Sequence, residues 1–456
     1  MSRVAPYATQ ALTSPRTRAA RRWIAEQRRL LRREPHRVLY FHQVDDPYSY
    51  LAAQALRPLL DRYDVVLEPC LAGPPPDDAA PERARLEALS REDAADVAPG
   101  YGLEFPARSE APAPGEVALA AGMLQGAVAA GTFADAAPLV GRALWRGERD
   151  SIKTLSKDFA PADAGATEAA VAAGSALRAR LGHYLGAMFY YGGEWYWGVD
   201  RLWHLERRLR ALGAHRAGAV TDPIVSRPDL TSAPHVTLDL RHAGRPGVEP
   251  ELPDRRVTLE FYPSLRSPYT AISMERVFAL PRRYPIELVI RPVLPMVMRG
   301  LPVPRAKQIY IVLDTKREAE DACVPFGRIA DPLGRPIERA FSLFAWARER
   351  GRAAELLQSF ARSAFAEGIE TGTDAGLRRI VERAGLSWTE ALEHLDREGW
   401  REELEENRKT LFEMGLWGVP SFRIIGGAGK TDYHTWGQDR LWRVEQEISR
   451  RLEGSE

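Results

Sequence analysis

A strand followed by a helix is predicted near the middle of the chain, where the pattern of apolar and polar residues changes. From residue 257 to 262 apolar and polar side chains largely alternate, and a period of two predicts a strand. After a break at 263–266, apolar residues return at helical spacing, at Ala271, Met274 and Phe278. A tight turn therefore leads from a strand into an amphipathic helix.

Two residues mark the start of this helix. Pro268 lies where the first turn should be, a position that tolerates proline. Ser267 precedes it, so its hydroxyl would lie beside the free N–H groups and the positive dipole end of the helix. A thiolate would be stabilised there, and because no cysteine is present we interpret the turn as a site for the sulfur of a bound thiol. Taken alone, Ser267 is better explained as a helix cap, worth about 1 kcal/mol over alanine.

The same succession of elements occurs twice along the chain. Three pairs of segments match: WGVDRLWHLE with WGQDRLWRVE, LGHYLGAMF with MGLWGVPSF, and VLYFHQVDDPYSYLA with VTLEFYPSLRSPYTA once one residue is inserted. The first pair shares seven of ten residues, and all three keep their order at a nearly constant offset. This regularity indicates a duplicated domain.

The repeated unit reads as strand, helix, strand, helical insertion, β-hairpin and helix. This order predicts an α/β protein with two thioredoxin-like domains, each with a helical insertion. We expect four parts: a helical extension (1–35), a first domain (36–212), a linker rich in Pro, Gly, His and Arg (213–255) and a second domain (256–456). Strands are predicted at 38–42, 65–69, 286–290 and 419–425.

The GVP motif at 418–420 opens the last of these strands, where the thioredoxin fold carries a cis-proline. We predict a cis Val419–Pro420 bond, which would present the Val419 backbone to a peptide-like ligand. The matching bond in the first domain precedes Ala187 and should be trans, since a cis bond before a residue other than proline costs several kcal/mol.

Composition and charge narrow the class of protein. The 456 residues are 45% hydrophobic and 27% charged with a net charge of +1, which is typical of a soluble globular protein and gives no reason to expect nucleic acid or a membrane as partner. The arginine-rich segment 16–37 predicts an exposed helix leading into the first strand rather than a targeting segment. We expect a cytoplasmic protein.

The residues suited to redox, metal or nucleotide chemistry form no recognisable motif. Cys70 and Cys323 are far apart and in no CxxC spacing, which excludes a disulfide scaffold and fits a reducing compartment. The histidines show no metal-ligand spacing, so no metal is expected. No GxGxxG or P-loop is present, which argues against a bound nucleotide.

The second half resembles the DsbA-like group that contains 2-hydroxychromene-2-carboxylate isomerases and kappa-class glutathione transferases. The motifs that carry the resemblance are FYPSLRSPYTA, RGLPVPRAKQIY, GLWGVPSF and WGQDR. The resemblance covers most of residues 256–452 and, more loosely, 36–212. It implies glutathione as cofactor or cosubstrate and a small-molecule substrate.

The resemblance also implies roles for individual residues. Ser267 would be the catalytic group that keeps the glutathione sulfur as thiolate. The other glutathione contacts it implies are Lys307 at the glycyl end, Val419 and Pro420 at the cysteinyl part, and Gln438 and Asp439 at the γ-glutamyl group. Tyr269 and Trp417 would contact the substrate.

Several positions depart from the pattern of that group. Leu301 stands where an asparagine is usual, so a polar contact is missing, and the loop to Lys307 looks short. In the first domain Asp46 replaces the serine and Ala187 the cis-proline. Since a carboxylate would repel a thiolate, we expect that domain to be degenerate for glutathione. The two halves could form a pseudo-dimer within one chain.

Three functions remain open from the sequence. The main hypothesis is a glutathione-dependent isomerase or transferase acting on an aromatic or conjugated organic acid. The second is a non-catalytic thioredoxin-fold scaffold or peptide-binding protein, which Asp46, Ala187 and Leu301 favour. The third, a DsbA-type oxidoreductase, is disfavoured because Ser267 and Thr270 occupy the positions of a CxxC motif.

Overall fold

The computed structural model describes residues 4–107, 110–225, 228, 257–427 and 431–453. The chain divides into two compact units, each described by itself below. The C-terminal unit comprises Met1–Thr17, Ser232–Val303 and Ile311–Glu456, and the N-terminal unit comprises Arg18–Thr231 and Pro304–Tyr310. Most of the predicted linker lies outside the described residues.

A four-stranded sheet forms the centre of the C-terminal unit. Its strands are β5 (Val257–Tyr262), β6 (Ile286–Ile290), β7 (Ser421–Gly426) and β8 (Tyr433–Trp436), in the order β6-β5-β7-β8. β5 is parallel to β6 and antiparallel to β7, and β7 is antiparallel to β8. The strand predicted at 286–290 is confirmed with these bounds, and the last predicted strand begins two residues late, at Ser421.

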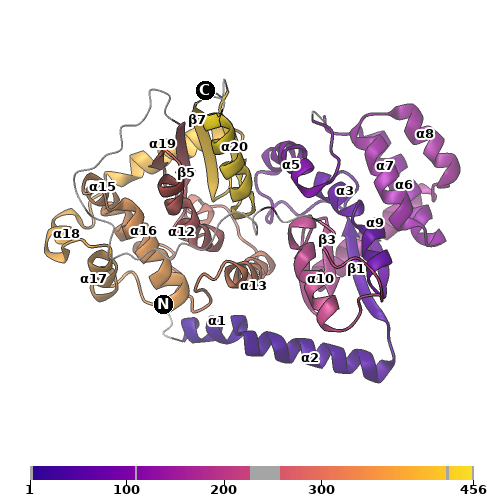
Figure 1. The fold of residues 1–456 in the computed structure, drawn as a ribbon, viewed down its shortest axis with the longest axis horizontal. Helices are drawn as coiled ribbons and strands as arrows, with labels where there is room; N and C mark the ends of the chain where they lie inside the picture. The colour runs from indigo at the N-terminus through magenta and orange to yellow at the C-terminus, as the bar shows by residue number, and fades with distance from the viewer. Residues whose placement is uncertain (1–3, 108–109, 226–227, 229–256, 428–430, 454–456) are drawn as a thin grey trace. The chain divides into compact units, whose positions relative to one another are not determined.

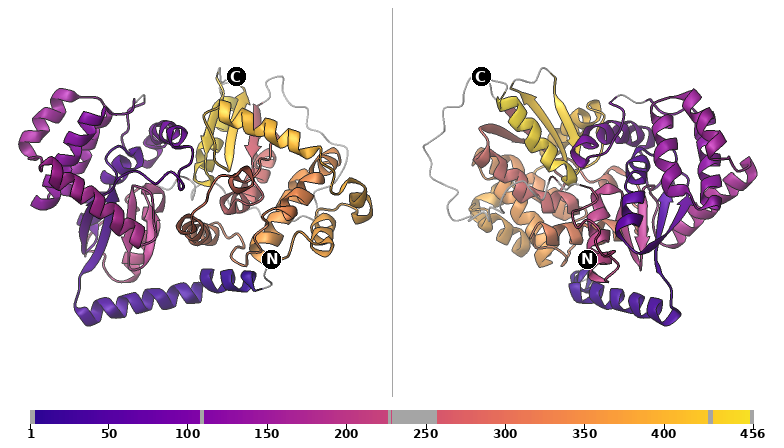
Figure 2. Two further views of the ribbon diagram at one scale, coloured as in Figure 1. Left: turned by 180° about the vertical axis from the view of Figure 1, so that it is seen from behind. Right: turned by 45° about the vertical axis from the view of Figure 1, so that its right-hand side comes forward.

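Helices surround this sheet and fill the long interval between β6 and β7. They are α1 (Ala5–Thr13), α12 (Pro268–Arg283), α13 (Arg305–Asp321, whose residues up to Tyr310 belong to the other unit), α14 (Arg335–Ser342), α15 (Phe344–Glu349), α16 (Ala353–Arg362), α17 (Asp374–Arg383), α18 (Trp388–His394), α19 (Trp400–Glu413) and α20 (Leu441–Glu453), with short helical turns at Met296–Arg299, Ser363–Glu367 and Gln438–Arg440. The predicted all-helical insertion is thus observed (Figures 1 and 2).

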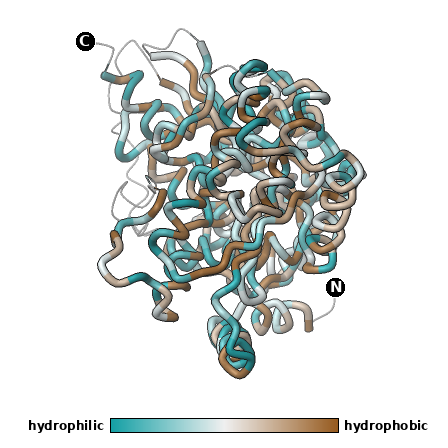
Figure 3. The backbone as a smooth tube through the Cα atoms, turned by 90° about the vertical axis from the view of Figure 1, so that its right-hand side faces the viewer, coloured by the Kyte–Doolittle hydropathy of each residue, from teal (hydrophilic) through white to brown (hydrophobic). Residues whose placement is uncertain are grey.

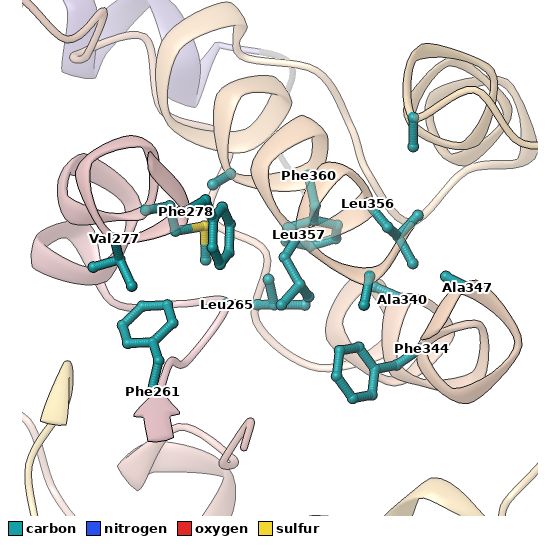
Figure 4. Packing of buried hydrophobic residues seen from close by; sticks show 14 of the residues in the cluster. Phe261, Leu265, Val277, Phe278, Ala340, Phe344, Ala347, Leu356, Leu357 and Phe360 are labelled. Carbon is teal, nitrogen blue, oxygen red and sulfur yellow. The ribbon is translucent and has the colours of Figure 1, made fainter. Parts of the chain in front are cut away.

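The core of this unit joins the sheet to the helical insertion. Figure 4 shows Phe261 of β5 directed toward Val277 of α12, and Leu265 lying near Leu357 of α16. The rings of Phe261 and Phe422 stack with centroids 5.5 Å apart across the β5–β7 pair. Because the turn after β5 is anchored by this packing, the start of α12 is held in a fixed place.

The N-terminal unit contains a second sheet with the equivalent strand order. Its strands are β1 (His36–His42), β2 (Val65–Leu71), β3 (Met188–Tyr191) and β4 (Glu194–Trp197), in the order β2-β1-β3-β4. Its helices are α2 (Pro15–Arg32, which starts in the other unit), α3 (Pro47–Ala53), α4 (Leu56–Arg62), α5 (Arg83–Val97), α6 (Pro114–Ala130), α7 (Phe133–Trp145), α8 (Arg149–Asp158), α9 (Ala164–Arg180) and α10 (Leu202–Ala211), with short helical turns at Pro99–Tyr101 and Val199–Arg201. The chain is therefore a mixed α/β protein with one such sheet in each half.

Hydrophobic stretches alternate with hydrophilic ones along the described parts of the backbone (Figure 3). Within the described residues, no helix combines the length and the apolar character needed to cross a bilayer.

Candidate functional site

Ser267 lies where the sequence predicts it, at the N-terminus of the 16-residue helix α12. Its Oγ accepts a hydrogen bond from the Thr270 N–H at 3.2 Å, so the predicted helix cap is confirmed. The same hydroxyl donates to the Val419 carbonyl at 3.4 Å. This second bond is longer than the 2.7–2.8 Å typical of O–H···O bonds and is therefore weak. The Ser267 hydroxyl is thus directed toward the loop that contains Val419 and Pro420, but its hydrogen bond to that loop is weak.

The loop before β7 contains the cis Val419–Pro420 bond, as predicted. Its position is fixed by the Gly437 N–H, which donates to the Pro420 carbonyl at 2.9 Å, and by the Ser421 hydroxyl, which donates to Gly418. Val419 itself is half-buried, and within the described part of the chain no hydrogen bond engages its N–H. A backbone donor thus remains available beside the Ser267 hydroxyl.

Close packing beneath this loop requires a glycine. A β-carbon at Gly418 would lie 2.3 Å from Nε1 of Trp436, so no larger residue fits without a shift. Trp417 is 4% exposed, and its ring centroid lies 6.1 Å from that of Trp436. Trp417 therefore belongs to the support of the loop, and its contact with substrate stays a prediction.

Tyr269, the other residue assigned to substrate, is tied to the helical insertion. Its hydroxyl donates to Oδ2 of Asp314 at 2.8 Å, and Asp314 is fully buried and also accepts from Arg317 at 2.9 Å. The equivalent tyrosine of the first half, Tyr48, makes the same kind of bond to Asp93 at 2.7 Å. Because both halves keep the bond, it has a structural role that the sequence did not reveal.

The Gln438 amide is saturated by protein groups. Its Oε1 accepts from Arg276 at 2.6 Å, and its Nε2 donates to Glu318 at 3.2 Å and to the neighbouring Asp439. Gln438 is 3% exposed. A γ-glutamyl group could reach this amide only if some of these bonds opened, so the predicted contacts of Gln438 and Asp439 stay untested.

Lys307 falls in the segment Pro304–Tyr310, which belongs to the N-terminal unit, whereas Ser267 belongs to the C-terminal one. The Lys307 ammonium donates to the Ala79 carbonyl at 2.8 Å. Burial lowers its pKa to about 8, against an opposing effect of the Asp78 charge. Its predicted role at the glycyl end of glutathione is not tested by this geometry.

In the N-terminal unit the equivalent turn is closed by its own side chains. Asp46 caps α3 and accepts from the Ser49 N–H at 3.0 Å and from the Ser49 hydroxyl at 2.7 Å. The Ser49 Oγ also accepts from the N–H groups of Gln43 and Ala187, at 3.1 and 2.9 Å. Burial raises the pKa of Asp46 to about 6. These bonds tie the Ala187 loop directly to the helix.

The backbone here departs from that of the other half, as predicted. Among the described residues the bond before Pro420 is the only cis peptide, so the bond before Ala187 is trans, and Ala187 adopts a positive φ of 54°. A β-carbon at Gly186 would lie 2.8 Å from the Asp46 carboxylate, which shows how closely the loop and the helix approach. The trans bond is thus confirmed, and the degeneracy of the first half for glutathione stays a prediction.

Two buried polar residues of the N-terminal unit were missed by the sequence analysis. In the ungapped alignment, Arg178 and His183 occupy the positions of Leu411 and Leu416 of the other half. Arg178 donates to the Gly73 carbonyl at 2.9 Å, while its Nε and Nη1 have no hydrogen-bond partner. Burial lowers the pKa of Arg178 to about 10 and that of His183 well below 6.5. The alignment itself could have shown that apolar positions of one half are polar in the other.

Neither cysteine lies at the Ser267 turn. Cys70 is in β2 of the N-terminal unit, and burial raises the pKa of its thiol to about 11. Cys323 is exposed just beyond α13. Among the described residues, no group of three or more His, Cys, Asp and Glu side chains could hold a metal ion.

A strand order of β6-β5-β7-β8, a capped helix after the first strand and a cis-proline loop define a thioredoxin-like domain. Residues 258–449 match the family model of the DSBA-like thioredoxin domain, which confirms the resemblance predicted from the motifs.

Several solved structures are similar to part of this chain. A 2-hydroxychromene-2-carboxylate isomerase is 21% identical with a TM-score of 0.35, covering 42% of this chain and 95% of its own. A probable DsbA oxidoreductase from Streptomyces coelicolor is 19% identical (TM-score 0.34; 43% and 91% covered). The cytosolic disulfide reductase DsbM from Pseudomonas aeruginosa, solved with GSH, is 17% identical (TM-score 0.30; 43% and 100% covered). A search of curated proteins finds no match.

Proposed function

We propose that the DSBA-like domain binds glutathione, holds its sulfur as a thiolate at the Ser267 turn, and serves an isomerase or transferase reaction on an aromatic or conjugated organic acid. The observation that carries the proposal is the Val419 N–H beside the Ser267 hydroxyl, because none of the described residues accepts a hydrogen bond from this N–H. A peptide-like thiol could pair with this backbone as a short added strand.

The Ser267 turn has the donors that a thiolate needs. Its hydroxyl donates only a weak 3.4 Å bond to Val419, so it could donate a hydrogen bond to a bound sulfur instead at small cost. The 16 residues of α12 add the positive end of the helix dipole. Both effects lower the pKa of a thiol placed there, and the thiolate is the reactive form.

The protein's part in the reaction would be to bind and orient glutathione and to lower the pKa of its thiol, so that the thiol releases its proton to solvent. When bound, glutathione supplies a nucleophile that can add to an activated double bond, allow rotation and leave again. Ser267 would hold the negative charge on the sulfur, and the Val419 backbone would fix the cysteinyl part. Of the protein's own thiols, Cys70 is a poor candidate because burial raises its pKa to about 11, and Cys323 lies outside the Ser267 turn.

A non-catalytic scaffold or peptide-binding role is the competing proposal. It is favoured by Gln438, whose amide is already saturated by Arg276, Glu318 and Asp439. In that case the Val419 backbone would pair with a peptide strand, and the Ser267 hydroxyl would serve only as a cap.

Calorimetric titration with glutathione separates these alternatives. We expect one site per chain, in the second domain, with weaker binding for Ser267→Ala. Thr270→Val is the matched control, because the Thr270 hydroxyl is buried in the same turn and has no hydrogen-bond partner among the described residues. S-methylglutathione, which cannot form a thiolate, should bind less well than glutathione.

Two results would contradict the proposal. One is two equivalent sites per chain, or no binding at millimolar glutathione. The other is that glutathione and S-methylglutathione bind with equal affinity, and that Ser267→Ala leaves both affinities unchanged. That result would mean that the turn does not stabilise a negative charge on the sulfur.

A further inference from the structure

The helix α2 presents an apolar face to solvent. Trp23, Ile24, Leu30 and Leu31 are 64%, 42%, 52% and 84% exposed. At 3.6 residues per turn these four side chains fall within an arc of about 120°. None of the 18 residues of α2 is buried. A continuous exposed stripe of this kind on a soluble domain marks an interaction surface.

A cationic stripe runs beside the apolar one. Arg21, Arg28 and Arg32 are exposed and lie on the adjacent arc of the helix. The 18 residues of α2 contain seven arginines and one glutamate, a net charge of +6, whereas the whole chain has +1. The single glutamate, Glu26, is neutralised by Arg29 at 2.6 Å. Just beyond the helix, Glu34 lies 3.9 Å from Arg32. The exposed side of α2 is therefore both apolar and strongly positive.

The remaining side of α2 is anchored to the N-terminal unit. Arg22 makes a bidentate ion pair with Glu194 of β4, both bonds being 2.7 Å long. Arg22 lies well away from the arc of Trp23, Ile24 and Leu30–Leu31 on the helix circumference. The helix is thus fixed with its apolar and cationic stripes directed away from the contact with Glu194.

We propose that α2 docks this protein on an anionic lipid surface. A helix with arginines on one face and Trp, Ile and Leu on another lies in the plane of a bilayer, its apolar side chains at the acyl boundary and its arginines at the phosphates. Two α2 helices paired with each other would bring like charges together, so a second copy fits less well. The proposal departs from the prediction of no membrane partner, which rested on the balanced charge of the whole chain and not on this helix.

Co-sedimentation of the full chain with lipid vesicles tests this inference. The wild type should bind vesicles rich in phosphatidylserine, remain free of pure phosphatidylcholine vesicles, and be released by high salt. Arg21→Gln/Arg28→Gln should weaken binding roughly 30-fold, about fivefold for each arginine. Leu30→Ser/Leu31→Ser should weaken it at least about tenfold.

Leu139→Ser/Leu392→Ser is the matched control, since these leucines are 42% and 50% exposed on other helices. It should leave vesicle binding unchanged. The inference is overturned if the wild type ignores phosphatidylserine vesicles or if the α2 variants bind as the wild type does. Concentration-dependent self-association that the α2 variants abolish, or binding to polyglutamate without vesicle binding, would equally overturn it in favour of a protein partner.

Discussion

Replacing Ser267 with alanine should raise the pKa of the bound glutathione thiol. The variant removes the hydroxyl that caps α12 at 3.2 Å and faces Val419 at 3.4 Å. A hydrogen bond to a charged group contributes roughly 1.5–3 kcal/mol, which corresponds to about one to two pKa units. The shift should not exceed this range, because the α12 dipole still supplies part of the stabilisation.

The assay is the thiolate absorbance of bound glutathione as a function of pH. Thr270→Val should titrate like the wild type, since its hydroxyl makes no hydrogen bond. The loss of the cap should also lower the unfolding free energy by about 1 kcal/mol, so binding is measured well below the melting temperature.

A second variant separates the bound thiol from the protein's own thiols. Cys70→Ser/Cys323→Ser should keep most of any glutathione-dependent activity, because neither cysteine lies at the Ser267 turn. An unchanged thiol titration in Ser267→Ala, together with loss of turnover in the double cysteine variant, would refute the reasoning and leave Ser267 as a cap alone.

Three further predictions concern stability. Glu260→Ala should lower the unfolding free energy, measured by chemical denaturation, by about 2–3 kcal/mol. The loss is smaller than for a fully buried ion pair because its partner Arg291 is 40% exposed. Glu287→Ala, at an exposed position, is the control. The pKa of Asp46 in the folded protein, about 6, exceeds its ordinary value of 3.8, so the unfolding free energy should fall as the pH rises from 3.8 to 6. Asp46→Asn should abolish this fall in denaturation curves recorded over that pH range. Gly418→Ala should lower the unfolding free energy by about 1–3 kcal/mol and weaken glutathione binding, because its β-carbon would lie 2.3 Å from the indole nitrogen of Trp436. Gly399→Ala, with open space around it, should leave the unfolding free energy unchanged in the same thermal melts. Equal effects of the two variants would contradict the packing argument.

The sequence determined the order of elements and the two central residues of the site. Ser267 before Pro268 and Pro420 at a strand start are local signals, readable because caps and turns depend on residues next to one another. The apolar periodicity placed β5, α12 and β6, and the ordered repeat of three segments predicted that both halves share one strand order. Neighbouring residues suffice for such features, since hydrogen bonding and burial along one strand or helix follow from its own pattern.

Tertiary structure alone decided which side chains the site has available. Gln438 is saturated by Arg276 and Glu318, residues more than a hundred positions away, and Lys307 is bonded to Ala79 across a still longer interval. Periodicity carries no information on such pairs, because a polar side chain takes whichever buried partner the packed chain brings within hydrogen-bond distance. The closed turn around Ser49 in the first half and the open Val419 donor in the second have the same origin. The two halves share one strand order but differ in the side chains and in the backbone of this loop, and these differences either satisfy the donors of the loop or leave one without a partner among the described residues.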